Sequence, residues 1–199
     1  MSVSQFPEDP RKIKKLISRY ERRLRKEYKS FGAIRDGYGA RYLLGPLHMV
    51  LGDLPGAMRS FGWFEENFPD DIGEPFHYLC WTLALYRSGD LAAAAQKLRW
   101  TMLSNLYLIP HLLGTEQGEY PFRRTMNSEE KEWVLEGDLA LLSLWDAPAL
   151  QWVRQTYQGR ECRRVRERYV HICTLLEGES PEPRRSRLVE ELYDLRARR

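Results

Sequence analysis

The chain has 199 residues, of which 43% are hydrophobic and 30% charged, and its formal net charge is +3. A chain of this length and composition buries a sizeable core, and its many aromatic residues argue against intrinsic disorder. The longest uncharged apolar stretch of the central region, 76–86, is too short for a membrane span, which needs roughly 20 residues. No secretory signal precedes the first basic cluster, and the cysteines form no CxxC pair, so we expect a cytoplasmic protein.

The segment 1–34 predicts an N-terminal basic amphipathic helix. Asp9-Pro10 is a typical helix start, since Asp caps and Pro occupies the first helical position, and Gly32 can end the helix. Apolar residues recur every three or four positions from Ile13 to Leu24, which predicts one packed stripe. The opposite face either is a solvated helix face or contacts phosphates or anionic lipid. The candidate anion or nucleic-acid contacts are Lys12, Lys15, Arg19, Arg22, Lys26, Arg123 and Arg124.

The central section 35–113 contains a repeat, with copies at about 38–71 and 75–108. The two copies align on Gly52-Asp53 and Gly89-Asp90, which corresponds to a 34-residue period with a three-residue insertion. Each glycine can end one helix in a left-handed conformation, and each aspartate can cap the next helix. The alignment also places Ala57 on Ala94, where a small side chain allows two helices to approach closely. Pro46 falls inside the first predicted helix and should kink it.

These positions resemble the tetratricopeptide repeat over about 70 residues, most clearly in the first copy with Leu44-Gly45, Gly52-Asp53, Ala57, Phe61 and Pro69. The stretch SNLYLIPHLLG that follows is similar to one that follows the repeats in a group of bacterial tetratricopeptide proteins. The resemblance implies antiparallel helix pairs stacked into an α-α superhelix with flanking helices. It also implies a concave groove that binds a protein or peptide.

The resemblance assigns mostly apolar residues to this groove. No Lys, Arg or Asn occupies its positions, so the family's carboxylate clamp is not expected. The groove either accepts an amphipathic helix of a partner, or a second copy of the chain, or is filled by the chain's own helices at 10–29 or 184–198. The groove residues that the resemblance implies are Tyr42, Leu43, Pro46, Met49, Phe76, Leu79, Cys80, Leu83 and Tyr86.

The rest of the chain also predicts helices. The segment 114–177 begins with an irregular loop, after which Asn127 and Glu130 can form a capping box for a helix that reaches Trp145. Asp146 starts another helix, and a linker and a last helix make up 178–199. Because no segment shows sustained strand alternation, we expect one all-α domain.

The sequence offers little sign of catalysis. The four histidines have no metal-ligand spacing, and nucleotide-binding and nucleophile motifs are absent, so we predict no catalytic residue, metal or cofactor. The prediction is a non-enzymatic interaction scaffold with tetratricopeptide-like repeats. One alternative is a nucleic-acid-associated protein that uses the basic helix. A weaker one is an enzyme on a helical solenoid that uses His111 and acidic residues of the 115–130 loop.

Overall fold

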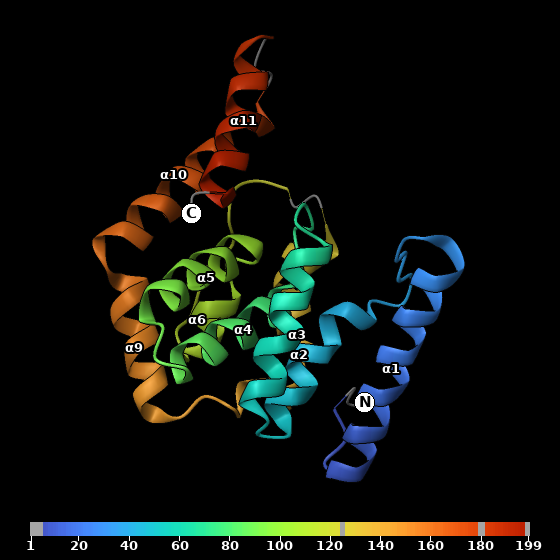
Figure 1. Cartoon of the computed structure of the whole chain (residues 1–199). Helices are drawn as coiled ribbons and strands as arrows, with labels where there is room; N and C mark the ends of the chain where they lie inside the picture. The colour runs from blue at the N-terminus through green and yellow to red at the C-terminus, as the bar shows by residue number, and fades with distance from the viewer. Residues whose placement is uncertain (1–5, 124–125, 179–181, 198–199) are drawn as a thin grey trace.

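The computed structural model describes residues 6–123, 126–178 and 182–197, and this part of the chain is helical without any strand (Figure 1). The all-α prediction is therefore confirmed. Within the same residues, no helix combines the length and apolarity required to cross a membrane. The helices are α1 (Pro10–Phe31), α2 (Ala40–Val50), α3 (Leu54–Asn67), α4 (Pro75–Arg87), α5 (Leu91–Ser104), α6 (Leu108–Leu112), the 3-10 turn η1 (Asn127–Glu129), α7 (Lys131–Leu135), α8 (Leu139–Leu142), α9 (Ala147–Gln158), α10 (Arg160–Glu177) and α11 (Arg184–Ala197).

The helices α2 to α5 form two hairpins with the predicted turns. Gly52 and Gly89 have φ angles of 72° and 86°, in the left-handed region that glycine adopts without steric cost. The carboxylates of Asp53 and Asp90 each accept a hydrogen bond of 3.0 Å from a backbone N–H in the first turn of the next helix. Helix α2 packs on α3 and α4, and α4 packs on α5, so the two hairpins share one core.

Pro46 does not end α2, which continues to Val50. Proline has no N–H, so the carbonyl of Tyr42, four residues earlier, loses its usual helical donor. His77 of α4 supplies a donor instead, with its Nδ1 at 3.0 Å from that carbonyl. The missing hydrogen bond within α2 is thus replaced by one between the two hairpins.

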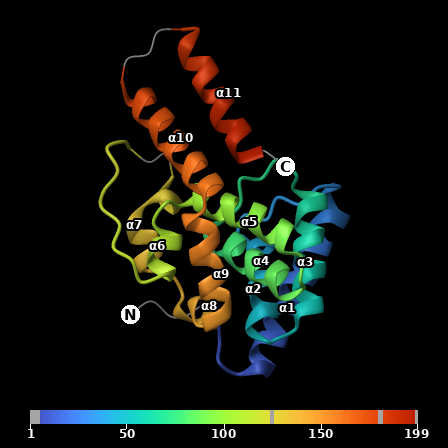
Figure 2. The ribbon, with the colours of Figure 1, turned by 90° about the vertical axis from the view of Figure 1, so that its left-hand side faces the viewer.

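The remaining helices surround the hairpins on two sides. Helix α1 packs against α2 and forms one edge of the molecule (Figure 1). Helices α9 and α10 pack against α5 on the other side. Figure 2 shows α10 and α11 side by side, extending beyond the hairpins, and α11 also contacts α5. The 184–198 helix, one of the candidates for covering the groove, thus packs on α10 and α5.

The segment after residue 126 is more broken than the sequence suggested. Instead of one helix from a capping box to Trp145, the chain forms η1, α7 and α8. Glu130 is itself the N-cap residue of α7, and the side chain of Asp138 caps α8. Gly137 lies between these two helices against the ring of Phe76, where a Cβ atom would overlap the ring. The break between α7 and α8 thus falls at the residue that packs against Phe76 of α4.

Two helical glycines of the first hairpin should respond oppositely to the same substitution. A Cβ on Gly45 would overlap the fully buried ring of Phe61, whereas a Cβ on Gly62 would meet no atom within 4 Å. We expect Gly45→Ala to lower the free energy of unfolding by about 2 kcal/mol through overpacking. Gly62→Ala should raise it by up to about 1 kcal/mol, because alanine favours the helix. Urea unfolding measures both, and equal stability of the two variants would contradict the close approach of α2 and α3.

Candidate functional site

Most of the predicted groove residues lie inside the protein. The exposed fractions are 2% for Met49, 6% for Phe76 and 0% for Leu79 and Leu83, as well as for Cys80. Pro46 is buried too, whereas Tyr42, Leu43 and Tyr86 are half-buried. A partner therefore cannot touch the buried members of this set unless part of the chain moves away from them.

The chain's own segment between α7 and α9 covers the first helices of the two hairpins. Gly137 lies on the ring of Phe76, and α8 packs against α2. Farther along α4, the ring of Tyr86 lies 5.1 Å from that of Trp152 on α9. The chain itself thus covers several of the predicted groove residues through Gly137, α8 and Trp152. The helices at 10–29 and 184–198 were the two candidates for such a cover within the chain. Those two helices pack on α2 and on α10, respectively.

An open cavity of about 580 Å³ remains where this covering is incomplete. We call it the α2–α8 cavity, because α2, the start of α4 and the segment 133–141 surround it. Four of the predicted groove residues still line it. Its lining consists of Phe6, Tyr38, Gly39, Tyr42, Leu43, Pro46, Glu74, Phe76, Trp133, Glu136, Gly137, Asp138, Leu139 and Leu141.

The α2–α8 cavity combines an apolar rim with acidic groups. Tyr38 and Leu139 are 76% and 75% exposed, and Trp133 is 40% exposed, so large apolar side chains gather around its mouth. Trp133 is held by a hydrogen bond of 3.1 Å from its Nε1 to Glu74 Oε1. The other oxygen of Glu74 accepts from the backbone N–H of His77 at the start of α4. Burial raises the pKa of the Glu74 carboxyl.

A second cavity of about 600 Å³ lies between α1 and the first hairpin. Tyr28 and Trp63 contribute apolar surface to it, but its charged lining carries both signs. Arg25 and Glu21, which both line it, already pair with each other at 3.1 Å. This cavity therefore selects less clearly for the charge of a ligand than the α2–α8 cavity does.

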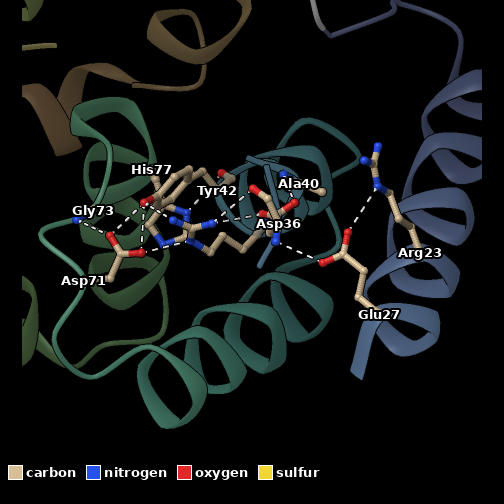
Figure 3. Close-up of polar contacts among 9 residues, drawn as sticks. Arg23, Glu27, Asp36, Ala40, Tyr42, Asp71, Gly73 and His77 are labelled. Atoms are coloured by element: carbon tan, nitrogen blue, oxygen red, sulfur yellow. Dashed lines mark hydrogen bonds and ion pairs between the residues drawn. The ribbon is translucent and has the colours of Figure 1, made fainter. Parts of the chain in front are cut away.

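A polar network around Asp36 joins α1 to the first hairpin and the hairpins to each other (Figure 3). Asp36 has a φ of 39° and a side chain that is 0% exposed. Its carboxylate accepts from the backbone N–H groups of Ala40 and Arg41 at 2.9 and 2.8 Å, which satisfies two free donors at the start of α2. The guanidinium of Arg41 bridges from Asp36 to Asp71, with distances of 3.3 and 2.9 Å.

Tyr42 belongs to this network as well as to the wall of the α2–α8 cavity. Its hydroxyl donates to Asp71 at 2.7 Å and accepts from the Arg41 guanidinium at 2.8 Å (Figure 3). Asp71 also accepts from the backbone N–H of Gly73 at 2.8 Å, which shapes the loop before α4. Burial and the bond to Asp71 raise the pKa of Tyr42, so its phenol stays protonated at neutral pH. Tyr42, which the resemblance assigns to the groove, therefore also links α2 to the loop before α4.

The same network fixes α1. Glu27 of α1 accepts a hydrogen bond of 2.9 Å from the backbone N–H of Asp36, and it pairs with Arg23 at 3.7 Å. The Arg23 guanidinium also lies 3.6 Å from the centre of the Tyr38 ring, a cation–π distance. The position of the basic helix is thus set by contacts near its C-terminal end.

A buried lysine, Lys97, lies in an aromatic box that the sequence did not indicate. The ammonium of Lys97 lies 3.4 Å from the centre of the Trp81 ring and 4.0 Å from that of Trp100, and 3.4 Å from Glu65. Burial lowers the pKa of Lys97 to about 8, while the ring faces favour the charged form. The spacing of Lys97 and Trp100 was readable in the sequence, but the pairing with Trp81 across the hairpin was not. The box is filled by the chain itself.

The candidate anion contacts separate into two groups. Lys12, Lys15, Arg19, Arg22 and Lys26 are all exposed on α1. Arg123 is exposed near the end of α10, where its backbone N–H donates to Glu177 at 2.7 Å. Arg124 lies outside the described residues. The structure therefore joins the first five into one surface and does not bring Arg123 to it, since α10 and α1 lie on different sides of the hairpins (Figure 1).

The enzyme alternative relies on His111 and acidic residues of the 115–130 loop. His111 is half-buried at the end of α6 and lines neither of the two cavities described above. His48 pairs with Asp53 at 2.8 Å. Within the described residues, no three His, Cys, Asp or Glu side chains come together in a way that could hold a metal ion.

Comparisons with known proteins identify no relative. No family model matches this chain, and neither a curated protein nor a solved structure matches it.

Proposed function

We propose that this protein is a non-enzymatic interaction scaffold built on two tetratricopeptide-like hairpins, α2–α3 and α4–α5. In this proposal the α2–α8 cavity binds a helical segment of a partner protein that carries an apolar side chain next to lysine or arginine. The observation that carries the proposal is an open cavity with exposed apolar residues at its rim and carboxylates as the charged groups of its lining.

The apolar rim supports a binding role. Isolated apolar residues on a surface need no explanation, but a group of them around a hollow usually marks a binding site. Tyr38, Trp133 and Leu139 come from three different segments and meet at this one cavity. A volume of about 580 Å³ accommodates one or two large side chains of a partner.

The charged groups of the cavity support a partner with a basic residue. Glu74, Glu136 and Asp138 line it, and none of the described lining residues is basic. Carboxylates near an apolar pocket favour a cationic neighbour to the apolar anchor and disfavour an acidic one. An amphipathic helix presents such a pattern when an apolar residue and a basic residue lie three or four positions apart.

The proposed location is the cytoplasm. Cys80 and Cys162 are free thiols that are buried as small apolar side chains. Unpaired cysteines of this kind support a reducing compartment.

A peptide-display selection tests the proposal. Helical peptides of random sequence, selected on the full chain, should converge on a Leu or aromatic anchor flanked by Lys or Arg. Leu139→Glu should weaken binding of the selected peptide at least about tenfold, because it places a charge at the apolar rim. Leu91→Glu is the matched control on α5, where the side chain is also exposed and lies away from the cavity, and it should leave affinity unchanged.

A charge reversal tests the preference for a basic partner. Glu136→Lys should weaken the same peptide, whereas Glu132→Lys, which is exposed on α7 but does not line the cavity, should not. Fluorescence anisotropy of the labelled peptide measures both. Selected peptides without basic residues, equal losses for Leu139→Glu and Leu91→Glu, or a homodimer that Leu139→Glu dissociates would each contradict the proposal.

A further inference from the structure

Five basic side chains form one straight row on α1. Lys12, Lys15, Arg19, Arg22 and Lys26 are spaced by three and four residues in alternation, which places them on one face of the helix. At a rise of 1.5 Å per residue the row is about 21 Å long. All five side chains are exposed.

The positive charge of this row is not neutralised within the described part of the chain. The acidic residues of α1 are Glu21 and Glu27, and they pair with Arg25 and Arg23 rather than with the row. None of the five row residues makes an ion pair with another described residue. A shallow hollow of about 640 Å³ runs along the first part of the row, lined by Lys12, Lys15, Arg19 and Arg22 among others.

The opposite face of α1 is already occupied. Ile13, Ile17 and Leu24 are 1%, 7% and 2% exposed, and α1 packs against α2. A helix that binds a membrane surface needs an apolar face to insert between lipids. The stripe from Ile13 to Leu24 is used within the protein, so the row offers cations with only Pro7 and the half-buried Leu16 as apolar lining of its hollow.

We infer that this row of α1 binds the phosphate backbone of a nucleic-acid duplex without reading its sequence. The rigid helix presents successive cations 4.5 or 6 Å apart along its axis by the helical rise, so the whole row can contact several phosphates of one duplex at once. Single-stranded binding relies on exposed aromatic side chains beside the charges. The ring beside this row is that of Tyr20, 5.3 Å from the Arg19 guanidinium, and it is half-buried. This surface is independent of the α2–α8 cavity and of the partner proposed for it.

The salt dependence of binding to a labelled DNA duplex of about 20 base pairs tests the inference. Five phosphate contacts predict a slope of about −4.5 for the logarithm of affinity against the logarithm of salt concentration. Affinity should therefore fall about 500-fold between about 50 and 200 mM salt. Duplexes of unrelated sequence should bind with similar affinity, because phosphate contacts carry no sequence information.

Replacing all five row residues with glutamine should reduce duplex affinity at low salt by at least about 100-fold. The smaller variant Lys12→Gln/Lys15→Gln, which perturbs the helix less, should reduce the slope by about two. The charge-matched control replaces five exposed arginines of α10 and α11 with glutamine, and it should keep most of the affinity. These control residues are Arg160, Arg163, Arg164, Arg184 and Arg187.

Three results would overturn the inference. The first is an equal loss of affinity in the row variant and in the charge-matched control, which would indicate net charge rather than a surface. The second is binding that depends strongly on the duplex sequence. The third is retention on vesicles that contain phosphatidylserine without binding to the duplex at the same salt concentration. Circular dichroism of each variant verifies that the helices remain intact.

Discussion

Asp36→Ala is expected to lower the free energy of unfolding by about 3 kcal/mol. The alanine would leave the backbone N–H groups of Ala40 and Arg41 without their acceptors at the start of α2. It would also remove one of the two carboxylates that hold the guanidinium of Arg41. A φ of 39° adds a further cost, because alanine tolerates the left-handed region less well than aspartate does.

Two matched variants separate these causes. Asp36→Asn keeps an oxygen acceptor and tolerates the left-handed backbone, so it should lose only about half as much stability. Asp9→Ala removes an exposed cap of α1 that holds a single N–H, that of Arg11, and it should cost about 1 kcal/mol. Chemical denaturation measures all three. An Asp36→Ala variant no less stable than Asp9→Ala would contradict the central role of the Asp36 network.

The same substitution should loosen α1. Its contact with the first hairpin includes the bond from the Asp36 backbone to Glu27, whose geometry depends on the left-handed conformation of residue 36. We expect hydrogen exchange in α1 and in the first turn of α2 to accelerate in Asp36→Ala, while α4 and α5 keep their protection. Uniform acceleration in all helices would instead indicate a global loss of stability alone.

The second large effect is a loss of stability in acid that originates at His77. The ring is 0% exposed and lies among aromatic rings, with Phe64 at 4.5 Å and Phe61 at 5.1 Å between ring centres. Burial lowers the pKa of His77 to about 4, and the nearby positive charges of Lys97 and Arg41 act in the same direction. The folded protein therefore holds the neutral imidazole, whose Nδ1 donates to the carbonyl of Tyr42.

The sign of the effect follows from proton binding. In the unfolded chain a histidine has a pKa of about 6.5, so between pH 6.5 and 4 the unfolded state binds a proton that the folded state does not. The stabilising contribution of the neutral ring is complete above pH 6.5 and is lost as the pH falls toward 4. Over this pH range the contribution of His77 to the free energy of unfolding falls by about 3 kcal/mol.

Comparison with His77→Phe isolates this contribution from that of the carboxylates, which also titrate in acid. The phenyl ring fits an aromatic environment but cannot take up a proton. The stability difference between the natural protein and the variant should therefore shift against the natural protein by about 3 kcal/mol as the pH falls from 7 to 4. Urea unfolding at several pH values measures the difference. A difference that does not change with pH would contradict a buried neutral His77.

The ends of the helices followed from the sequence because their causes are local. A glycine at positive φ and an aspartate that bonds an N–H two or three residues later depend only on neighbouring residues. Gly52-Asp53, Gly89-Asp90 and Asp9-Pro10 therefore mark helix ends in the structure as the sequence indicated. The basic face of α1 was readable for the same reason, since helical spacing alone places those side chains together.

The α2–α8 cavity was only partly foreseen. The resemblance to a repeat family assigned Tyr42, Leu43 and Phe76 to a binding groove, and these residues line the cavity. Trp133 and Leu139 complete its rim from a segment that the sequence presented as part of one long helix. Nothing in the local pattern showed that this segment would break at Gly137 and fold back over α2 and α4.

Composition and helical spacing by themselves determined that this protein is all-α and where its hairpins turn. Only the tertiary structure decided which segment covers α2 and α4, the first helices of the two hairpins. It also placed Lys97 between Trp81 and Trp100, and it made Asp36 the link from α1 to α2. The physical reason is that capping and backbone conformation act over a few residues along the chain. Burial and charge pairing depend instead on distances between residues far apart in sequence, and these distances exist only once the helices have packed.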